Sequence, residues 1–156
     1  MKQFLSTHIN RIDRKGRVSV PAPFRAVLGE EAGGILLFQS LTDPALDACA
    51  EAHLERLSTN MDAMGLTPAA HMALETAIYG AAQFVPFDGE GRIVLPDVLR
   101  DVSGIGEQVA FFGRRHMFQL WQPERLEQHI REERAAAKAQ GLSLALLLSR
   151  PGRGPS

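Results

Sequence analysis

Asp13-Arg-Lys-Gly-Arg-Val-Ser-Val-Pro21 and Asp88-Gly-Glu-Gly-Arg-Ile-Val-Leu-Pro96 are two copies of one motif, and every matched position is 75 residues apart. Both follow the pattern Asp-x-x-Gly-Arg-(Val/Ile)-x-(Val/Leu)-Pro, and an arginine stands four residues after each proline, at Arg25 and Arg100. Such a repeat predicts two equivalent structural units, neither of which buries its apolar face alone. We therefore expect a pseudo-two-fold fold.

The residues around the first motif predict a β-hairpin followed by a short helix. Residues 4–12 and 17–20 have β-branched, roughly alternating patterns, and Gly16 lies in the stretch between them. Glycine can adopt the positive φ that a tight turn requires. Pro21 ends the second strand because proline cannot donate to a ladder, and a helix is expected from Pro23 to residue 28.

The rest of the chain repeats this order after a helical insertion. Residues at helical spacing, Leu46, Cys49, His53 and Leu57, predict one helix, and Thr67 is expected to cap a second helix over residues 68–82. The sequence further predicts strands at 35–38, 83–87, 92–95, 109–112 and 118–121, a short helix at 96–102, a charged helix at 123–140, an apolar helix at 142–149 and a tail at 150–156. The expected domains are residues 1–82, 83–140 and 141–156.

Composition is that of a globular protein, with 45% hydrophobic and 22% charged residues in 156. The apolar run from Leu142 to Leu148 is too short to span a bilayer and the N-terminus lacks a signal-peptide pattern, so we expect a cytoplasmic protein. Cys49 is the single cysteine, which excludes an intrachain disulfide and a cysteine-pair zinc site. No metal or cofactor is expected, and Cys49 should be a small buried apolar residue.

Charge is distributed unevenly along the chain. Residues 1–28 contain six cations and one acid, a net charge of +5, whereas the remainder contains 11 cations and 17 acids, a net charge of −6. This asymmetry favours a local polyanion-binding surface, although a solvated charged face would have the same composition.

Catalytic motifs are not found. The five histidines do not form a His-Glu-x-x-His pattern, neither Gly-rich turn matches a nucleotide-binding loop, and no serine lies in a nucleophile elbow. We therefore predict that the chain is not an enzyme, and no small-molecule substrate site is evident.

With two motif copies at this separation, the sequence resembles the MraZ family over almost its whole length. One copy alone would indicate only an AbrB-like or SpoVT-like swapped-hairpin element. The resemblance implies an α+β fold in which two tandem AbrB-like swapped-hairpin units form an intrachain pseudo-dimeric β-barrel with flanking helices. It also implies a bacterial, nucleoid-associated transcriptional regulator that assembles into a ring and binds repeated DNA boxes upstream of the division and cell-wall gene cluster, including its own gene.

The residues of the first hairpin fit this expectation. Arg14, Lys15 and Arg17 could neutralise phosphates, and a two-stranded ribbon fits the major groove, where arginine can bind guanine through two hydrogen bonds. Arg11 and Arg25 are further DNA-binding candidates. Residues 88–100 carry a net charge of −1, so the first copy should make most phosphate contacts.

The letters that both copies share have a competing, structural explanation. An aspartate and an arginine that flank a glycine turn can form a geometrically specific bridge that sets the hairpin. Arg17 remains a candidate for both roles. The residues expected to be structural are Asp13, Gly16, Pro21, Asp88, Gly91, Arg92 and Pro96.

Three alternatives remain open on sequence grounds. The chain could be an antitoxin-like or scaffold oligomer that binds a protein partner. Phe111, Phe112, Phe118 and Trp121 could stack on single-stranded nucleic acid, although a core or subunit interface fits them better. Arg114-Arg115-His116 could be a second basic contact or a solvated loop.

Overall fold

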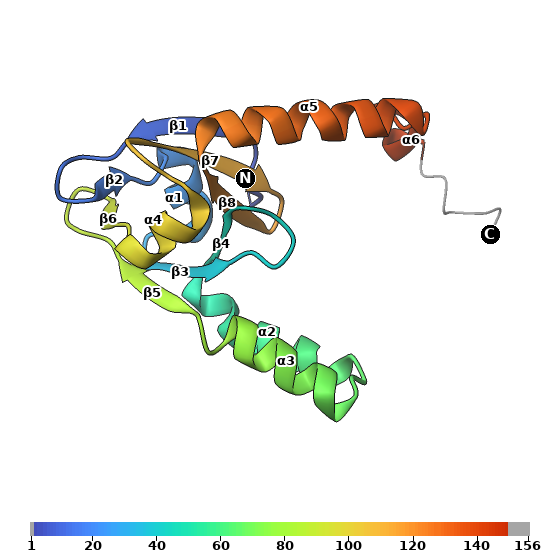
Figure 1. Cartoon of the computed structure of the whole chain (residues 1–156), viewed down its shortest axis with the longest axis horizontal. Coiled ribbons are helices and arrows are strands. Elements are labelled where there is room, and N and C mark those ends of the chain that lie inside the picture. The colour runs from blue at the N-terminus through green and yellow to red at the C-terminus, as the bar shows by residue number, and fades with distance from the viewer. Residues whose placement is uncertain (1, 150–156) are drawn as a thin grey trace. The chain divides into compact units, whose positions relative to one another are not determined.

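The computed structural model describes residues 2–149 and shows a mixed α+β chain (Figure 1). The chain divides into two compact units, Met1–Pro123 and Glu124–Ser156, and the first contains both motif copies. None of the described helices has the length and apolar character needed to cross a membrane. The tail predicted at 150–156 lies outside the described residues.

The two repeats contain the same elements in the same order, as predicted. Each has a strand, a turn, a short strand, a seven-residue helix and two further strands. The first repeat consists of β1 (Thr7–Arg11), β2 (Arg17–Ser19), α1 (Ala22–Leu28), β3 (Gly34–Gln39) and β4 (Leu46–Cys49). The second consists of β5 (Gln83–Pro86), β6 (Arg92–Val94), α4 (Asp97–Ser103), β7 (Gln108–Arg114) and β8 (Met117–Trp121).

Strands of one repeat pair mainly with strands of the other. The first strand of each repeat pairs with the third of the other, β1 with β7 and β5 with β3, and the second strands β2 and β6 pair together. The prediction that residues 4–12 and 17–20 form a hairpin ladder was therefore wrong. In the observed arrangement β1 and β2 reach their hydrogen-bonding partners in the other repeat, and the turn between them joins two ladders.

The register reveals a pseudo-two-fold axis. Val18 faces Ile93 in the β2–β6 ribbon, and Leu46 faces Leu120 in the β4–β8 pair, so each of these residues faces its own counterpart. The remaining pairs form one six-stranded sheet in the order β1-β7-β8-β4-β3-β5. In the described part of the chain β1 and β5 form the edges of this sheet, and the expected closure into a barrel is not observed.

The main core lies between the sheet and the β2–β6 ribbon and combines both repeats. Val18 and Ile93 at the centre of the ribbon are both 1% exposed, and their burial stabilises the fold by roughly 2 kcal/mol each. Phe24 of α1 packs edge-on against Phe4 at a centroid distance of 5.3 Å. Among the aromatic residues considered for nucleic-acid stacking, Phe111, Phe118 and Trp121 are fully buried, so their side chains belong to the interior.

A helical arm covers a second apolar cluster. It comprises the 3-10 turn Glu51–His53, α2 (Leu54–Ala63) and α3 (Pro68–Ile78), and Leu57 and Ile78 pack on Leu36 and Phe38 of β3. Thr67 caps α3 as predicted, since its hydroxyl accepts the Ala70 N–H at 3.2 Å.

The helix predicted from Leu46 to Leu57 was wrong over its first residues. Leu46–Cys49 form β4, because this segment pairs with β3 on one side and β8 on the other. Cys49 is buried as expected, and burial, together with the charge of Asp47, raises the pKa of its thiol to about 11. The thiol is therefore a packing group at neutral pH.

As far as it is described, to residue 149, the second unit contains two helices. These are α5 (Pro123–Ala139) and α6 (Leu144–Leu148), close to the predicted positions. An ion pair between Arg131 and Glu127, with 2.9 Å between Nη1 and Oε1, links successive turns of α5. Ser143 caps α6 by accepting the Leu146 N–H.

The exchange of strands predicts a strict requirement for glycine at position 34. A Cβ atom there would lie 2.7 Å from Cα of Pro86 and 2.8 Å from the carbonyl carbon of Val85, which is backbone of the other repeat. Gly34→Ala should therefore lower the free energy of unfolding by about 2 kcal/mol in a denaturant titration. Gly106→Ala, at a glycine with open space around it, is the control and should change stability far less. Equal stability of the two variants would contradict the observed β3–β5 contact.

Candidate nucleic-acid interface

The first turn, defined as residues 13–17, is organised by the Asp13 carboxylate. Its Oδ1 accepts the backbone N–H groups of Lys15 and Arg17, both at 2.9 Å, and its Oδ2 accepts Nε of Arg17 at 2.7 Å. The backbone closes the turn as well, since Asp13 N–H donates to the Arg17 carbonyl. One aspartate thus holds both the course of the backbone and the direction of an arginine.

The second turn, defined as residues 88–92, has the same construction. Asp88 Oδ1 accepts the N–H groups of Glu90 and Arg92 at 2.8 and 3.0 Å, and its Oδ2 accepts Nε of Arg92 at 2.8 Å. In both copies the aspartate and the arginine that the motif shares are thus joined by a hydrogen bond that closes the turn.

These hydrogen bonds determine the acidity of both aspartates. The backbone N–H of Arg17 is the main influence that lowers the pKa of Asp13, and the side chain of Arg17 and the Lys15 N–H act in the same direction. The backbone N–H of Arg92 is likewise the main influence that lowers the pKa of Asp88. Both carboxylates are consequently ionised when the turns are folded at neutral pH.

Each turn is hydrogen-bonded to the residue that follows the ribbon strand of the other repeat. Gly16 and Gly91 have φ values of +80° and +75°, which explains why glycine occupies this position in each motif. The Gly16 carbonyl accepts the Leu95 N–H at 2.9 Å, and the Gly91 carbonyl accepts the Val20 N–H at 3.2 Å. The position of each turn therefore depends on the other repeat.

The two arginines differ in how many of their guanidinium nitrogens are already engaged. Arg92 uses Nη2 in a second ion pair, with Glu90 at 3.5 Å. Arg17 has Asp13 as its single ion-pair partner among the described residues, and its side chain is 33% exposed. The first turn therefore presents an arginine whose Nε is held and whose two Nη groups remain available.

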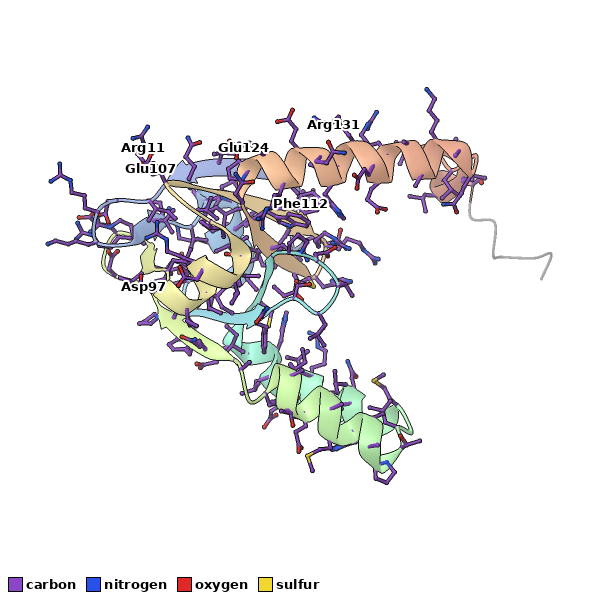
Figure 2. All side chains as sticks on the ribbon, in the orientation of Figure 1. Arg11, Asp97, Glu107, Phe112, Glu124 and Arg131 are labelled. Atoms are coloured by element: carbon purple, nitrogen blue, oxygen red, sulfur yellow. The ribbon has the colours of Figure 1, made fainter. Side chains whose placement is uncertain are left out.

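The predicted DNA-binding residues separate into two groups. Arg11, Arg14 and Lys15 are exposed, and within residues 2–149 their side chains form no ion pair and no hydrogen bond. Figure 2 shows the Arg11 side chain projecting away from the backbone of the protein. Together with Arg17 they form a basic group at and beside the first turn, although the acidic Glu107 stands at the same end of the β1–β7 ladder.

Arg25 lies apart from this group. Its Nε donates to the Val20 carbonyl at 3.0 Å, and its guanidinium packs on Gly91, where an added Cβ would be 2.8 Å from Cζ. Arg25 thus supports the second turn. Sequence reasoning missed this cross-repeat packing, for which the four-residue spacing between proline and arginine was the available indication.

The two prolines begin the short helices. Pro21 and Pro96 precede α1 and α4, and their carbonyls accept the N–H groups of Arg25 and Arg100 at 2.9 and 3.0 Å. Each proline carbonyl therefore accepts the first hydrogen bonds of the helix that follows it.

The lowered pKa values predict a dependence of stability on acid. A carboxyl group whose pKa is depressed by folding contributes stability above its unfolded pKa of about 3.9, and this contribution is lost as the pH falls through the folded pKa. Asp13→Asn and Asp88→Asn should each flatten the fall in stability below about pH 4, measured by denaturant titration at several pH values. Glu133→Gln on the exposed surface of α5 is the control. If stability falls with acid as steeply in both aspartate variants as in the wild type, the hydrogen bonds of Asp13 and Asp88 do not stabilise the turns as described.

Comparison with known proteins identifies the family. Residues 78–144 match the family model described as "MraZ protein, putative antitoxin-like". The chain is 38% identical over 145 residues to the transcriptional regulator MraZ of Rickettsia akari (strain Hartford), covering 92% of this chain and 97% of the relative. It is 40% identical over 146 residues to the transcriptional regulator MraZ of Rickettsia bellii (strain OSU 85-389), with the same coverage. Because this similarity spans nearly the whole of both chains, the protein belongs to the MraZ family.

Proposed function

We propose that this chain is a sequence-specific DNA-binding transcriptional regulator whose first turn makes the principal DNA contact. The observation that carries the proposal is a pair of turns with the same framework and opposite charge. Arg14 and Lys15 stand where the second turn has Gly89 and Glu90. The basic pair is exposed, as a phosphate contact requires.

Arg17 adds a group suited to reading base sequence. Its Nε is fixed by Asp13, while its Nη groups are available to acceptors in the major groove. A guanidinium that is oriented in advance loses less entropy when it binds guanine O6 and N7. We assign phosphate contacts to Arg14, Lys15 and Arg11, and base or phosphate contact to Arg17.

Spacing within one chain limits what a single subunit can do. Val20, whose N–H donates to the Gly91 carbonyl, lies four positions after Gly16, so the two turns are about 13 Å apart along the ribbon. The acidic second turn would be a poor phosphate ligand, and a single basic turn should bind weakly.

We therefore propose that several subunits act together. A ring of identical subunits would present its first turns to regularly spaced DNA boxes and gain affinity through linked sites. Family membership supports the further proposals that these boxes lie upstream of the division and cell-wall gene cluster, including the chain's own gene, and that the protein is cytoplasmic and nucleoid-associated.

A second candidate is an antitoxin-like or scaffold oligomer that binds a protein partner. The description of the matching family model favours keeping it. Salt dependence separates the two, because DNA affinity falls steeply with salt in proportion to the number of phosphates contacted.

Removing the basic pair should weaken DNA binding. For Arg14→Ala with Lys15→Ala we expect a loss of roughly 10- to 100-fold in affinity at 0.1 M salt. The salt slope, which is the steepness with which the logarithm of the binding constant falls with the logarithm of the salt concentration, should decrease by about 1.8 because two phosphate contacts are lost. Fluorescence anisotropy with promoter duplex over a salt series measures both quantities. Wild-type affinity and slope in the double variant would show that this assignment of the turn is wrong.

The second turn offers a matched gain-of-function variant. Gly89→Arg with Glu90→Lys would give the second turn the same two basic residues that the first turn has at Arg14 and Lys15. Gly89 has open space around its Cα and no positive φ, so the backbone should accept the change. We expect tighter duplex binding and a steeper salt slope, and a variant that binds DNA no better would argue against charge at the turn as the determinant.

Linked binding predicts a dependence on the number of boxes. Footprinting on the DNA upstream of the chain's own coding region should reveal protected, regularly spaced repeats. A duplex with several repeats should bind at least 10-fold more tightly than one with a single repeat. If random duplex binds as well as either, the proposal of a sequence-specific regulator fails.

A further inference from the structure

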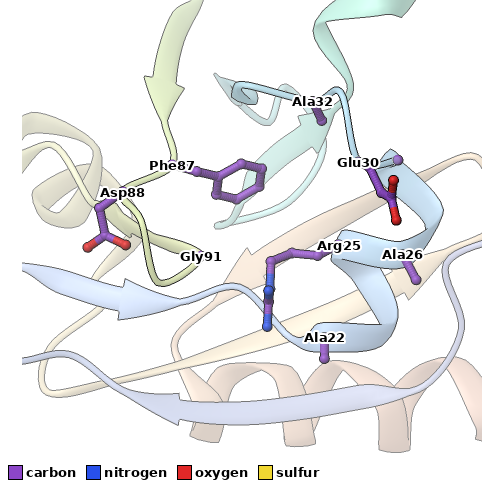
Figure 3. A pocket seen from close by; sticks show the side chains of 9 residues that line it. Ala22, Arg25, Ala26, Glu30, Ala32, Phe87, Asp88 and Gly91 are labelled. Carbon is purple, nitrogen blue, oxygen red and sulfur yellow. The ribbon is translucent and has the colours of Figure 1, made fainter.

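A pocket of about 500 Å³ lies between α1 and the second turn. Arg25, from α1, and Phe87 border it from different elements (Figure 3). The alanines at positions 22, 26 and 32 provide a further apolar lining. Its volume is in the range typical of small-molecule sites.

Arg25 is held in place at this pocket by one nitrogen of its guanidinium group, and its other N–H donors have no partner among residues 2–149. Its Nε is engaged by the Val20 carbonyl, and the guanidinium packs on Gly91. Within residues 2–149, Nη1 and Nη2 meet no hydrogen-bond acceptor. A half-buried guanidinium with an anchored Nε is oriented in advance for an oxyanion.

The second repeat shows how the same arginine is closed off. Its counterpart Arg100 donates from Nη2 to the Gly106 carbonyl at 2.6 Å, and the neighbouring Ile105 is only 5% exposed. In the first repeat the corresponding loop, residues 29–33, is one residue longer, and its exposed Glu30 is one of the residues that line the pocket. Pseudo-symmetry therefore supplies an internal comparison: one arginine is satisfied by its own loop, and the other is left open.

The acids at the pocket do not neutralise Arg25. The Asp88 oxygens accept hydrogen bonds from the N–H groups of Glu90 and Arg92 and from Nε of Arg92. Glu30 is exposed and forms no ion pair with Arg25 within 4.0 Å. An anionic group next to Arg25 would thus meet an unpaired charge, and its organic part would meet Phe87 and the alanines.

We propose that this pocket binds an oxyanion, a carboxylate or phosphate group, through Nη1 and Nη2 of Arg25. The apolar lining favours an anion that carries a small apolar body over a bare one. Two sources share this chemistry: a free organic acid or phosphate ester, and a backbone phosphate of bound DNA. The proposal does not depend on the DNA-binding role of the first turn.

The test is a titration of the ¹⁵N-labelled full chain with inorganic phosphate and with phenyl phosphate, followed by NMR. We expect saturable shifts of the Ala26, Gly29 and Gly91 amides, and tighter binding of phenyl phosphate. Arg25→Ala should weaken binding at least 10-fold, since it removes both charge-assisted hydrogen bonds. Arg131→Ala on α5 is the charge-matched control and should bind as the wild type does.

A second variant guards against a folding defect. Arg25→Gln keeps a donor that can reach the Val20 carbonyl but lacks the charged fork, so it should stay folded and still lose phenyl phosphate. Absence of saturable shifts at these amides, or wild-type affinity in a folded Arg25 variant, would overturn the site.

DNA titrations distinguish the two sources. If the ligand is a free anion, Arg25→Ala leaves the salt slope for promoter duplex unchanged, and phenyl phosphate binds alongside DNA. If the ligand is a DNA phosphate, Arg25→Ala lowers that slope by about 0.9 and phenyl phosphate competes with duplex. Failure of the first turn to bind DNA would leave the NMR result intact, so the two proposals can fail separately.

Discussion

Pairing of β2 with β6 is the interaction on which the rest of this structure depends. It places Val18 against Ile93 at the pseudo-two-fold axis and brings each glycine turn against the ribbon of the opposite repeat. Short strands of three residues would be marginal alone, and they persist because the ribbon covers a core built from both repeats. Neither repeat alone contains the hydrogen-bonding partners that all of its strands need.

This dependence explains the division between shared and differing letters in the motif. Aspartate, glycine and arginine recur because each turn needs a carboxylate to collect N–H groups, a residue at positive φ and a guanidinium to hold the carboxylate. The two residues between aspartate and glycine make no side-chain contribution to this framework in the first turn. They are free to differ, and they carry the contrast of charge between Arg14-Lys15 and Gly89-Glu90.

Asymmetry extends to the loops behind the turns. The arginine after each proline packs toward the glycine of the opposite turn, closely for Arg25 on Gly91 and more loosely for Arg100 near Gly16. In the second repeat Arg100 is capped by its own loop, whereas in the first repeat Arg25, which is followed by a loop one residue longer, borders an open pocket. A duplicated framework can thus support different surfaces without a change in the core.

The repeat, the order of its elements, the turn positions and the basic first copy can all be predicted from the sequence, because they follow from local patterns of glycine, proline, charge and alternation. The strand partners, in contrast, become apparent only in the folded chain. A three-residue strand such as β2 specifies no partner locally, and Leu46–Cys49 is as regular on a helix as on a strand until β3 and β8 flank it. For the same reason Arg25 was grouped with the DNA-binding cations by its charge, whereas its contact with Gly91 exists only after the repeats exchange strands.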